Sequence, residues 1–384
     1  MTLTEELRDY AYSIGFTKFG VTSMDRLQAF EEIIAPRSAD YFPWNTSAPF
    51  LQSDPKQLYP EGKSIIILAY DYANVHFPEE LTALAGKAYL SRCYKPLDTS
   101  ICGARVNLFH RFAESKGLTC LPIANDLPLR RLGMQAGVCD FGKNNFAYVQ
   151  GVGSFIILYG FVVDQVLDYD QPEKNSKCPE NCRKCVDACP TGALCEPFHL
   201  LPDKCVGFLN WMKRMDSGQF SSTIPRELRS KLGSMVHGCD ICQNVCPRNR
   251  QKAEGTFPKD AFLEFLKDHL TLEGMLRMDD GYYERYVYPV MYNYIDRKMI
   301  FQRNAAIAMG NSGDRKYIPA LAEALNDPEE CVRLHVAWSL GQLGGQEALQ
   351  ALKQRLEIET AETVIEEIQL ACAQIAAEAE PTRS

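Results

Sequence analysis

The sequence predicts a multidomain protein of mixed α/β and α-helical class. Its three parts are an α/β domain over residues 1–170, a cysteine-rich module over 171–255 and a helical region over 256–384. Three observations predict this order. Short β-branched runs alternate with helical patterns up to residue 170, closely spaced cysteines follow, and a sequence repeat occupies the C-terminal part.

The composition is that of a globular protein. The 384 residues suffice for two or three domains, and 46% of them are hydrophobic and 23% charged. The net charge of −8 means that a nucleic-acid partner would need a local basic patch, because such binding usually leaves a basic footprint. An ordinary solvated surface is the simpler interpretation of this charge.

The N-terminal residues lack the basic stretch and apolar run of a secretory signal. The apolar run over 152–163 contains Gly and Ser and suits a buried strand better than a membrane span. Fifteen cysteines without such a signal favour metal ligation over a disulfide framework. We therefore expect a cytoplasmic protein with no membrane contact.

Within the α/β domain, helical spacing predicts helices, and alternating or β-branched runs predict strands. The expected helices cover residues 3–14 and 104–115, and the expected strands cover 16–21, 64–70 and 155–163. The stretch over 35–62 is rich in Pro, Ser, Asp and aromatic residues, so an ordered loop is expected there.

The helical region repeats itself when the sequence is shifted by 31 residues. The shift aligns Ala306 with Ala337, Gly310 with Gly341, Gly313 with Gly344, Ala320 with Ala351, Leu321 with Leu352 and Leu325 with Leu356. This is a helical-hairpin repeat of the HEAT type, and two repeats must lean on the preceding part of the chain to bury a core. The tail is either a structural cap or a docking surface. Correspondingly, Arg303, Lys316 and Arg333 form a basic face or are ordinary solvated charges.

The cysteines carry the most specific pattern. A C-x₂-C-x₃-C-P run ends at Cys189-Pro190 and a second ends at Cys246-Pro247, which is the ending of bacterial ferredoxin runs. In that ferredoxin-like pattern the last cysteine of each run serves the other cluster, so two 4Fe–4S clusters are predicted. The ligands of the first cluster are Cys178, Cys182, Cys185 and Cys246, and those of the second are Cys189, Cys205, Cys239 and Cys242.

Two alternatives concern these ligands. Three residues, not two, separate Cys178 from Cys182, so the loop must bulge there or Cys195 must serve instead; otherwise Cys195 is a buried structural thiol. Zinc is the rival metal, although zinc sites lack the doubled C-x₃-C-P pattern. The remaining cysteines fall outside any ligand spacing and are expected as small buried hydrophobes: Cys93, Cys102, Cys120, Cys139, Cys331 and Cys372.

Together these parts resemble epoxyqueuosine reductase, a family whose cobalamin-dependent members complete queuosine in the tRNA wobble position. The best-matching stretches are 5–15, 54–64, 136–144, 153–154 and 238–247. Reductive dehalogenases share the middle of the pattern. The resemblance implies an oxidoreductase with an N-terminal cobalamin-binding domain, tRNA as a partner and reduced ferredoxin or flavodoxin as electron donor. A monomer is expected.

The resemblance also implies the residues near the corrin, namely Gly137, Gly142, Lys143, Asn144, Gly153 and Ser154. Small residues there would let the backbone approach the macrocycle. Turn geometry alone is the alternative explanation for the glycines.

The sequence departs from the family at the proton donor. Typical members place a catalytic aspartate seven residues before an arginine that is itself seven before the glycine of Ala-Gly. Here Arg130 and Gly137 fit, but Ile123 stands at the aspartate position. The nearest carboxylate, Asp126, is the candidate general acid; otherwise the acid has been lost. A Tyr-His pair of the family is replaced by Asp98-Thr99.

Three functions stay open. The favoured one is reduction of epoxyqueuosine to queuosine in tRNA through Co(I), with electrons relayed by the two clusters. The second is a paralogous reductase with the same cofactors and another substrate. The third is a two-cluster electron-transfer protein without corrin.

Overall fold

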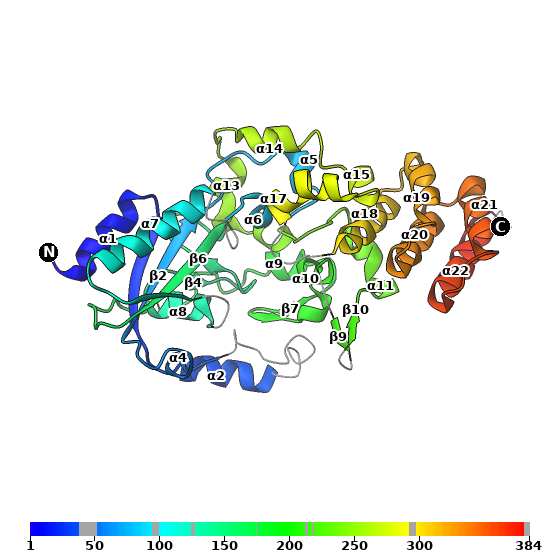
Figure 1. Ribbon diagram of the computed structural model, residues 1–384. Coiled ribbons are helices and arrows are strands. Elements are labelled where there is room, and N and C mark those ends of the chain that lie inside the picture. The colour runs from blue at the N-terminus through cyan, green and yellow to red at the C-terminus, as the bar shows by residue number, and fades with distance from the viewer. Residues whose placement is uncertain are drawn as a thin grey trace. The chain divides into compact units, whose positions relative to one another are not determined.

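The computed structural model describes residues 1–37, 52–93, 100–123, 127–173, 175–211, 214–216, 219–291 and 297–379 (Figure 1). Packing divides the chain into two compact units. The first unit consists of 1–76, 91–205 and 240–258, and the second of 77–90, 206–239 and 259–384. Since both units join separate stretches of chain, the linear domain boundaries at 170 and 255 stay a prediction.

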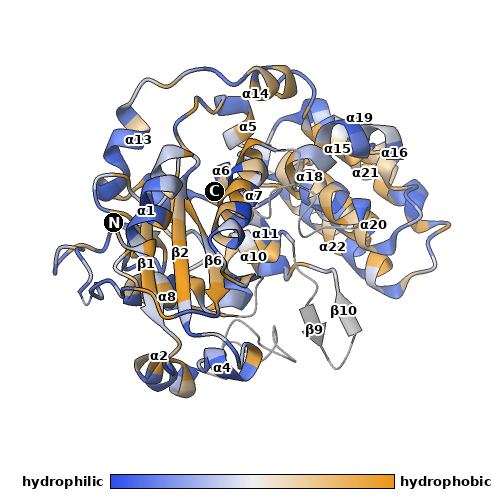
Figure 2. Cartoon of the chain, turned by 60° about the vertical axis from the view of Figure 1, so that its left-hand side comes forward, coloured by the Kyte–Doolittle hydropathy of each residue, from blue (hydrophilic) through white to orange (hydrophobic). Residues whose placement is uncertain are grey.

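A four-stranded antiparallel sheet organises the first unit. Its order is β1 (Lys18–Ser23), β2 (Ser64–Asp71), β6 (Ile156–Val163) and β3 (Cys120–Ile123). Figure 2 shows β1, β2 and β6 as largely hydrophobic, as expected of strands in a sheet that is covered on both faces. The three predicted strands are therefore present, and β3 is an edge strand that the sequence did not reveal.

Helices cover both faces of this sheet. On one face lie α1 (Leu3–Ser13) and α7 (Ile101–Ser115), and on the other α8 (Leu129–Gln135) packs on β1, β2 and β6. A capping box sets the start of α1, because the Thr2 hydroxyl accepts the Glu5 N–H while the Glu5 carboxylate accepts the Thr2 N–H. Both predicted helices are confirmed, with α7 beginning three residues before the predicted start.

Short elements complete the first unit: α2 (Gln28–Ile34), η1 (Ala35–Arg37), α4 (Pro55–Leu58), β4 (Asp140–Phe141), β5 (Ala147–Tyr148), α9 (Lys184–Asp187), β7 (Leu194–Glu196), β8 (His199–Leu200), η4 (Pro202–Lys204), α12 (Ile241–Asn244), η6 (Pro247–Asn249) and α13 (Arg250–Glu254). Most of the stretch predicted as an ordered loop, residues 38–51, lies outside the described residues.

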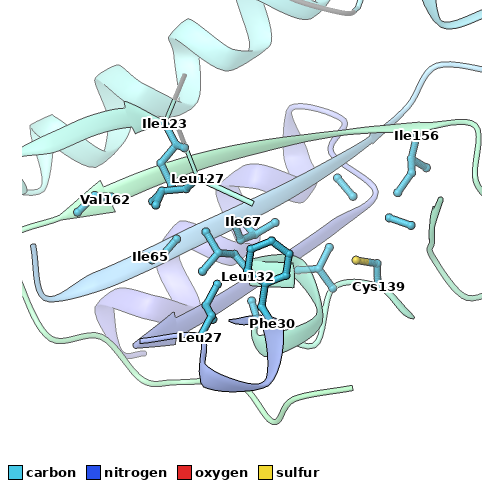
Figure 3. Close-up of a cluster of buried hydrophobic side chains, with 14 of the residues drawn as sticks. Leu27, Phe30, Ile65, Ile67, Ile123, Leu127, Leu132, Cys139, Ile156 and Val162 are labelled. Carbon is cyan, nitrogen blue, oxygen red and sulfur yellow. The ribbon is translucent and has the colours of Figure 1, made fainter. Parts of the chain in front are cut away.

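The core between α8 and the sheet is built by alternation along the strands (Figure 3). Ile65 and Ile67 of β2 point to this side and pack with Leu132 of α8, and all three are fully buried. Cys139 lies in the same cluster, and burial raises the pKa of its thiol to about 12. It is thus the small buried hydrophobe that the sequence predicted.

The second unit begins with short elements: α5 (Glu79–Thr82), α6 (Lys87–Leu90), α10 (Val206–Leu209), β9 (Arg214–Asp216), β10 (Gln219–Ser221), α11 (Arg226–Arg229), η5 (Ser230–Leu232), α14 (Ala261–Leu266), α15 (Leu272–Leu276), α16 (Asp280–Tyr282), η7 (Tyr283–Val287) and α17 (Tyr288–Met291). Its C-terminal part contains α18 (Lys298–Ser312), η8 (Arg315–Tyr317), α19 (Ile318–Ala324), α20 (Glu330–Leu343), α21 (Gly345–Leu356) and α22 (Glu362–Ala379).

Glycines that the 31-residue shift aligned occupy equivalent places in the repeat. Gly313 ends α18 and Gly344 ends α20, both with positive φ (68° and 65°), which favours glycine after a helix. Gly310 and Gly341 let neighbouring helices approach closely. A Cβ on Gly310 would lie 2.8 Å from Ser339 Cα, and one on Gly341 would lie 2.8 Å from Ala371 Cβ. The predicted helical-hairpin repeat is confirmed.

The arginines considered for a basic face are mostly internal. Arg303 is 1% exposed and donates hydrogen bonds to the carbonyls of Leu209 and Ser222. Asn304 next to it donates to the carbonyl of Val236 at 2.7 Å. The first repeat helix therefore leans on the preceding segment of its own unit, as expected. Neither a basic face nor a solvated charge describes Arg303, and Arg333 is also buried.

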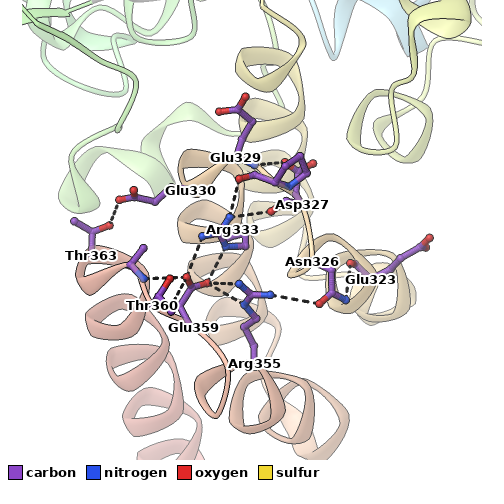
Figure 4. A network of polar contacts seen from close by, with 12 residues as sticks. Glu323, Asn326, Asp327, Glu329, Glu330, Arg333, Arg355, Glu359, Thr360 and Thr363 are labelled. Carbon is purple, nitrogen blue, oxygen red and sulfur yellow. Dashed lines mark hydrogen bonds and ion pairs between the residues drawn. The ribbon is translucent and has the colours of Figure 1, made fainter.

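Glu359 is the centre of a buried ion-pair network in the repeats (Figure 4). Its carboxylate accepts hydrogen bonds from Arg333 (2.7 and 2.9 Å), from Arg355 (2.9 Å) and from the N–H groups of Thr360 and Ala361 (3.0 Å each). Burial alone would raise the pKa of this carboxyl, but these donors outweigh it and lower the pKa to about 2. The Arg333 interaction, which the sequence had left open, is thus a structural ion pair.

This network predicts an acid-sensitive stability. A carboxyl whose pKa is lower in the folded chain than its ordinary 4.5 stabilises the fold fully above that value, and this contribution is lost as the pH falls towards about 2. We expect Glu359→Gln to lower the free energy of unfolding at pH 7 by about 3 kcal/mol and to flatten its decline below pH 4.5. Urea unfolding followed by far-UV circular dichroism at several pH values measures both. Glu357→Gln, at an exposed neighbour, is the control, and equal profiles for the two variants would contradict the prediction.

Candidate functional site

The two cysteine runs fold into the same local structure twice. Each run forms one short helix, α9 or α12, whose middle carries a predicted ligand, Cys185 or Cys242. The residues preceding the two helices have nearly the same backbone angles, φ −124° and ψ 7° at Arg183 and φ −112° and ψ 8° at Asp240. The C-x₂-C-x₃-C-P spacing thus encodes a single repeated turn, as the sequence suggested.

The last cysteine of each run leaves its helix in the same way. The N–H of Cys189 donates to the carbonyl of Val186 and the N–H of Cys246 donates to the carbonyl of Gln243, both at 3.2 Å. A proline follows each cysteine and ends the turn, because proline has no N–H and disfavours helical backbone before it. The two runs therefore end in the same backbone geometry at their last cysteine.

All four ligands predicted for the first cluster belong to the first unit, and Cys178, Cys185 and Cys246 lie near one another there. The Cys185 thiol is buried on α9, which packs on α12. Burial raises its pKa, and the nearby thiols of Cys246 and Cys178 raise it further. Cys182 stands two residues before the start of α9. Among the described residues no group of three or more His, Cys, Asp or Glu side chains is placed to hold a metal ion.

The second predicted set is divided between the two units. Cys189, Cys205 and Cys242 belong to the first unit, where Cys189 and Cys242 pack against the small apolar cluster of Cys185, Val186 and Leu194. Cys239 ends a segment of the second unit. The grouping of these four cysteines stays a prediction.

Cys195 differs from its expected alternative role. It lies on β7, is exposed, and its Sγ is 3.7 Å from the carbonyl of His199 on β8. The interpretation of Cys195 as a buried thiol is therefore wrong, because an irregular step in the β7–β8 ladder leaves this position at the surface. Cys178, by contrast, is half-buried, and the guanidinium of Arg248 contacts its thiol.

The irregular spacing between Cys178 and Cys182 has a structural explanation in Lys143. Its Nζ donates to the carbonyls of Pro179 (2.8 Å), Glu180 (2.5 Å) and Cys182 (3.0 Å). The side chain is buried, so its charge is compensated by these three dipoles. The additional residue is thus accommodated in a bulge that closes around one ammonium group.

Replacing this ammonium group should disrupt the first cluster loop. We expect Lys143→Met to leave the three carbonyls without their donor, to destabilise the loop by about 2–4 kcal/mol and to lower iron loading towards half. Lys177→Met, at an exposed lysine that pairs with Glu173, is the matched control. Iron per chain after anaerobic reconstitution measures the effect. Full loading of Lys143→Met would show that the bulge does not need its ammonium.

A buried carboxylate connects the chain segment before Cys178 to the segment after Cys246. Asp140 on β4 is 3% exposed and accepts from Arg248 Nη1 (2.8 Å) and Nη2 (2.5 Å) and from the Lys177 N–H (2.8 Å). Lys177 precedes Cys178, and Arg248 follows Cys246 by two residues. One buried carboxylate therefore fixes both chain segments that carry these cysteines.

Asn144 and Ser154 hold the second cysteine run. The Asn144 amide donates to the carbonyl of Cys242 at 3.1 Å, and the Ser154 hydroxyl donates to Gln243 at 2.9 Å. Asn249, which follows Cys246, accepts the Ser154 N–H at 2.8 Å. Neither Gln243 nor Asn249 was predicted as a functional residue, although both stand in or beside the second C-x₃-C-P run.

The three glycines implied near the corrin are explained by protein packing. A Cβ on Gly137 would lie 2.5 Å from the carbonyl oxygen of Gln171; on Gly142 it would overlap the Tyr148 ring, and on Gly153 the Asn249 amide. Gly137 and Gly153 also have positive φ (65° and 102°). Together with the Lys143, Asn144 and Ser154 contacts, this accounts for all six residues without a corrin. Their corrin contact stays a prediction.

The catalytic candidates lie partly outside the described residues. Asp126 and the Asp98-Thr99 pair lie outside the described residues. Arg130 is in the first turn of α8, and its Nη1 donates to the carbonyl of Asn145 at 2.5 Å.

No helix among the described residues is long and apolar enough to cross a membrane.

Comparison with known families identifies two parts of the chain. A family described as a 4Fe-4S double cluster binding domain matches residues 177–249, and HEAT repeats match residues 296–373. The cluster module and the repeats that the sequence predicted are both confirmed.

The chain is also similar to named proteins over nearly its whole length. It is 29% identical to epoxyqueuosine reductase of Bacillus subtilis, across 96% of this chain and 94% of that protein. It is 25% identical to the Escherichia coli epoxyqueuosine reductase, across 88% and 89% of the two chains. The predicted resemblance is confirmed, and these relatives indicate an oxidoreductase.

Solved structures agree with this resemblance. A crystal structure of epoxyqueuosine reductase with an epoxyqueuosine-modified tRNA-Tyr stem loop superposes with a TM-score of 0.81 and 26% identity, covering 97% of this chain and 99% of that one. The Bacillus subtilis enzyme with a catalytic aspartate loop swung out of its active site gives the same values.

Proposed function

We propose that this chain reduces epoxyqueuosine to queuosine in tRNA. The observation that carries the proposal is the near full-length similarity to epoxyqueuosine reductases, including one whose structure holds a modified tRNA stem loop. The double-cluster module supports a redox reaction, and the similarity to these relatives covers 96% of this chain.

The reaction requires two electrons and a proton to open the epoxide and remove its oxygen. In this proposal Cys178, Cys182, Cys185 and Cys246 hold one 4Fe–4S cluster, and Cys189, Cys205, Cys239 and Cys242 hold the other. Such clusters pass electrons singly. Lys143, Asp140 and Asn144 position the ligand loops, and Asp126 supplies the proton.

The remaining parts of the proposal come from the resemblance. They are cobalamin as a cofactor, reduced ferredoxin or flavodoxin as the electron donor, a monomeric state and a cytoplasmic location. The residues implied for the corrin also make the protein contacts described above.

A direct assay tests the function. Purified protein with both clusters reconstituted is incubated anaerobically with cobalamin, a low-potential reductant and tRNA carrying epoxyqueuosine, and the nucleosides are analysed by mass spectrometry. We expect queuosine to form. No turnover with clusters and cobalamin both bound would refute the proposal.

A second function is favoured by the altered catalytic region. Ile123 and Asp98-Thr99 replace residues that typical members use, whereas the cluster module is retained. A reductase with the same cofactors but another substrate would show this combination. It predicts that epoxyqueuosine-tRNA neither binds the protein nor oxidises its reduced clusters.

Corrin retention separates both reductases from a two-cluster electron-transfer protein. The clusters absorb broadly near 400 nm, while bound Co(II) and Co(III) corrins add separate bands. A protein that carries both clusters and retains no corrin after gel filtration would favour electron transfer alone.

A further inference from the structure

Two cysteines outside the cluster pattern lie together in the first unit. Cys93 precedes the segment 94–99, and Cys102 is the second residue of α7. They are 6% and 2% exposed, and their thiols hydrogen-bond to each other. The sequence predicts both as small buried hydrophobes, and both are buried; that they lie next to each other was not predicted.

The surroundings hold the two thiols in place. The hydroxyl of Tyr159 on β6 is 3.0 Å from the Cys102 sulfur and donates to the Cys93 carbonyl. The Cys93 thiol is also 3.3 Å from the carbonyl of Ser91, whose hydroxyl accepts the Cys93 N–H at 3.2 Å. One tyrosine from the central sheet thus contacts both cysteines.

The two sulfurs are not equivalent. Cys102 lies in the first turn of a 15-residue helix, where the positive end of the helix dipole favours a thiolate, and Arg105 follows one turn later. The hydrogen bond from Cys93 is the largest cause that lowers the pKa of Cys102, and the same bond raises the pKa of Cys93. Cys102 is therefore suited to attack, and Cys93 to supply a proton.

We propose that Cys93 and Cys102 are a redox-active thiol pair that forms a reversible disulfide, with Cys102 as the attacking sulfur. The oxidant is a small hydroperoxide, whose size suits buried thiols. The Cys102 thiolate breaks the O–O bond, becomes a sulfenic acid and releases hydroxide or alkoxide. The Cys93 sulfur then displaces the sulfenic oxygen, which leaves as water with the Cys93 proton.

The disulfide would tie the start of α7 to the chain that precedes it. The ring that it closes contains residues 94–99, and thus the Asp98-Thr99 pair that departs from the family pattern. This inference does not depend on the proposed function, because it rests only on the thiol pair and its neighbours.

The test uses the cluster-loaded chain, treated anaerobically with hydrogen peroxide up to the dose that oxidises exposed Cys195. The protein is then denatured, alkylated and digested with trypsin. Both cysteines fall on the one peptide 93–105, because trypsin does not cleave Lys95–Pro96. We expect this peptide to lack two hydrogens and both alkyl groups, and dithiothreitol to restore them. A doubly alkylated peptide at that dose would overturn the proposal.

Variants test the roles of the two sulfurs. In Cys93→Ser, dimedone should trap a sulfenic acid at Cys102, whereas in Cys102→Ser the Cys93 thiol should stay reduced. Cys139→Ser, at an isolated buried thiol, should form the disulfide like the natural chain. Dimedone capture at Cys93 equal to that at Cys102 would overturn the assignment of Cys102 as the attacking sulfur.

Discussion

Replacing Cys178 by serine is expected to remove one of the two clusters, whereas replacing Cys195 by serine should remove none. The structure separates these candidates: the Cys178 thiol contacts Arg248 and lies near Cys185, while Cys195 is exposed on β7. Since each 4Fe–4S cluster takes four cysteine thiolates, Cys178→Ser should lower iron from about eight to about four atoms per chain and abolish reductase activity.

Iron and acid-labile sulfide after anaerobic reconstitution measure this difference, together with the absorbance near 400 nm. Cys139→Ser controls for the loss of a buried thiol that is not a predicted ligand. Halved iron in Cys195→Ser with full iron in Cys178→Ser would transfer the ligand role to Cys195. The double variant Cys178→Ser/Cys246→Ser tests the crossed pairing: about four iron atoms should remain if both cysteines serve the same cluster, and almost none if they serve different clusters.

The strands show what local sequence could predict. Residues 64–70 and 155–163 are largely apolar runs, and both form central strands of the sheet. β3 was missed because it covers only four residues and contains Pro122. Proline is tolerated at the edge of a sheet, and β3 is an edge strand pairing with β6 alone. A local sequence pattern does not reveal which short segment will pair with the outer strand of a sheet.

For the candidate site too, the sequence predicts local features but not contacts between distant residues. Ligand spacing within each cysteine run is local, so the sequence predicts it. Asp140 and Arg248 were missed because 108 residues separate them, and neither stands in a spacing of its own. Lys143 was selected by resemblance as a corrin neighbour, but the contacts in the structure are the carbonyls of the Cys178–Cys182 bulge. Sequence thus predicted the importance of Lys143 without the contact that explains it.

In the repeats, the sequence predicted the period of the repeat but not the burial of its arginines. The 31-residue shift placed Gly313 and Gly344 at equivalent helix ends because helix termination is a local property. The burial of Arg303 and Arg333 depends on partners elsewhere in the fold, the Leu209 carbonyl and the Glu359 carboxylate. Charge alone therefore gave no indication of whether these arginines face solvent.

The second large effect is expected at Asp126. β3 ends at Ile123 and α8 begins at Leu129, so the five residues 124–128, which include Asp126, connect the sheet to the helix that carries Arg130. A carboxylic acid three residues beyond the family position can still reach the substrate if this connection is displaced along the chain. The related Bacillus subtilis enzyme has a catalytic aspartate on a loop that swings out of its active site.

We therefore expect Asp126→Asn to lower kcat by about 10²- to 10⁴-fold, because the amide has the shape of the acid but no proton to give. KM and iron content should stay unchanged, since the amide leaves the cluster loops and the size of the side chain as they are. Asp168→Asn, an exposed carboxylate at the end of the α/β segment, is the control, and Asp126→Glu should restore part of the rate. A kcat within about threefold of the natural chain would mean that the proton comes from another group, and would thereby favour the interpretation that the family's acid has been lost.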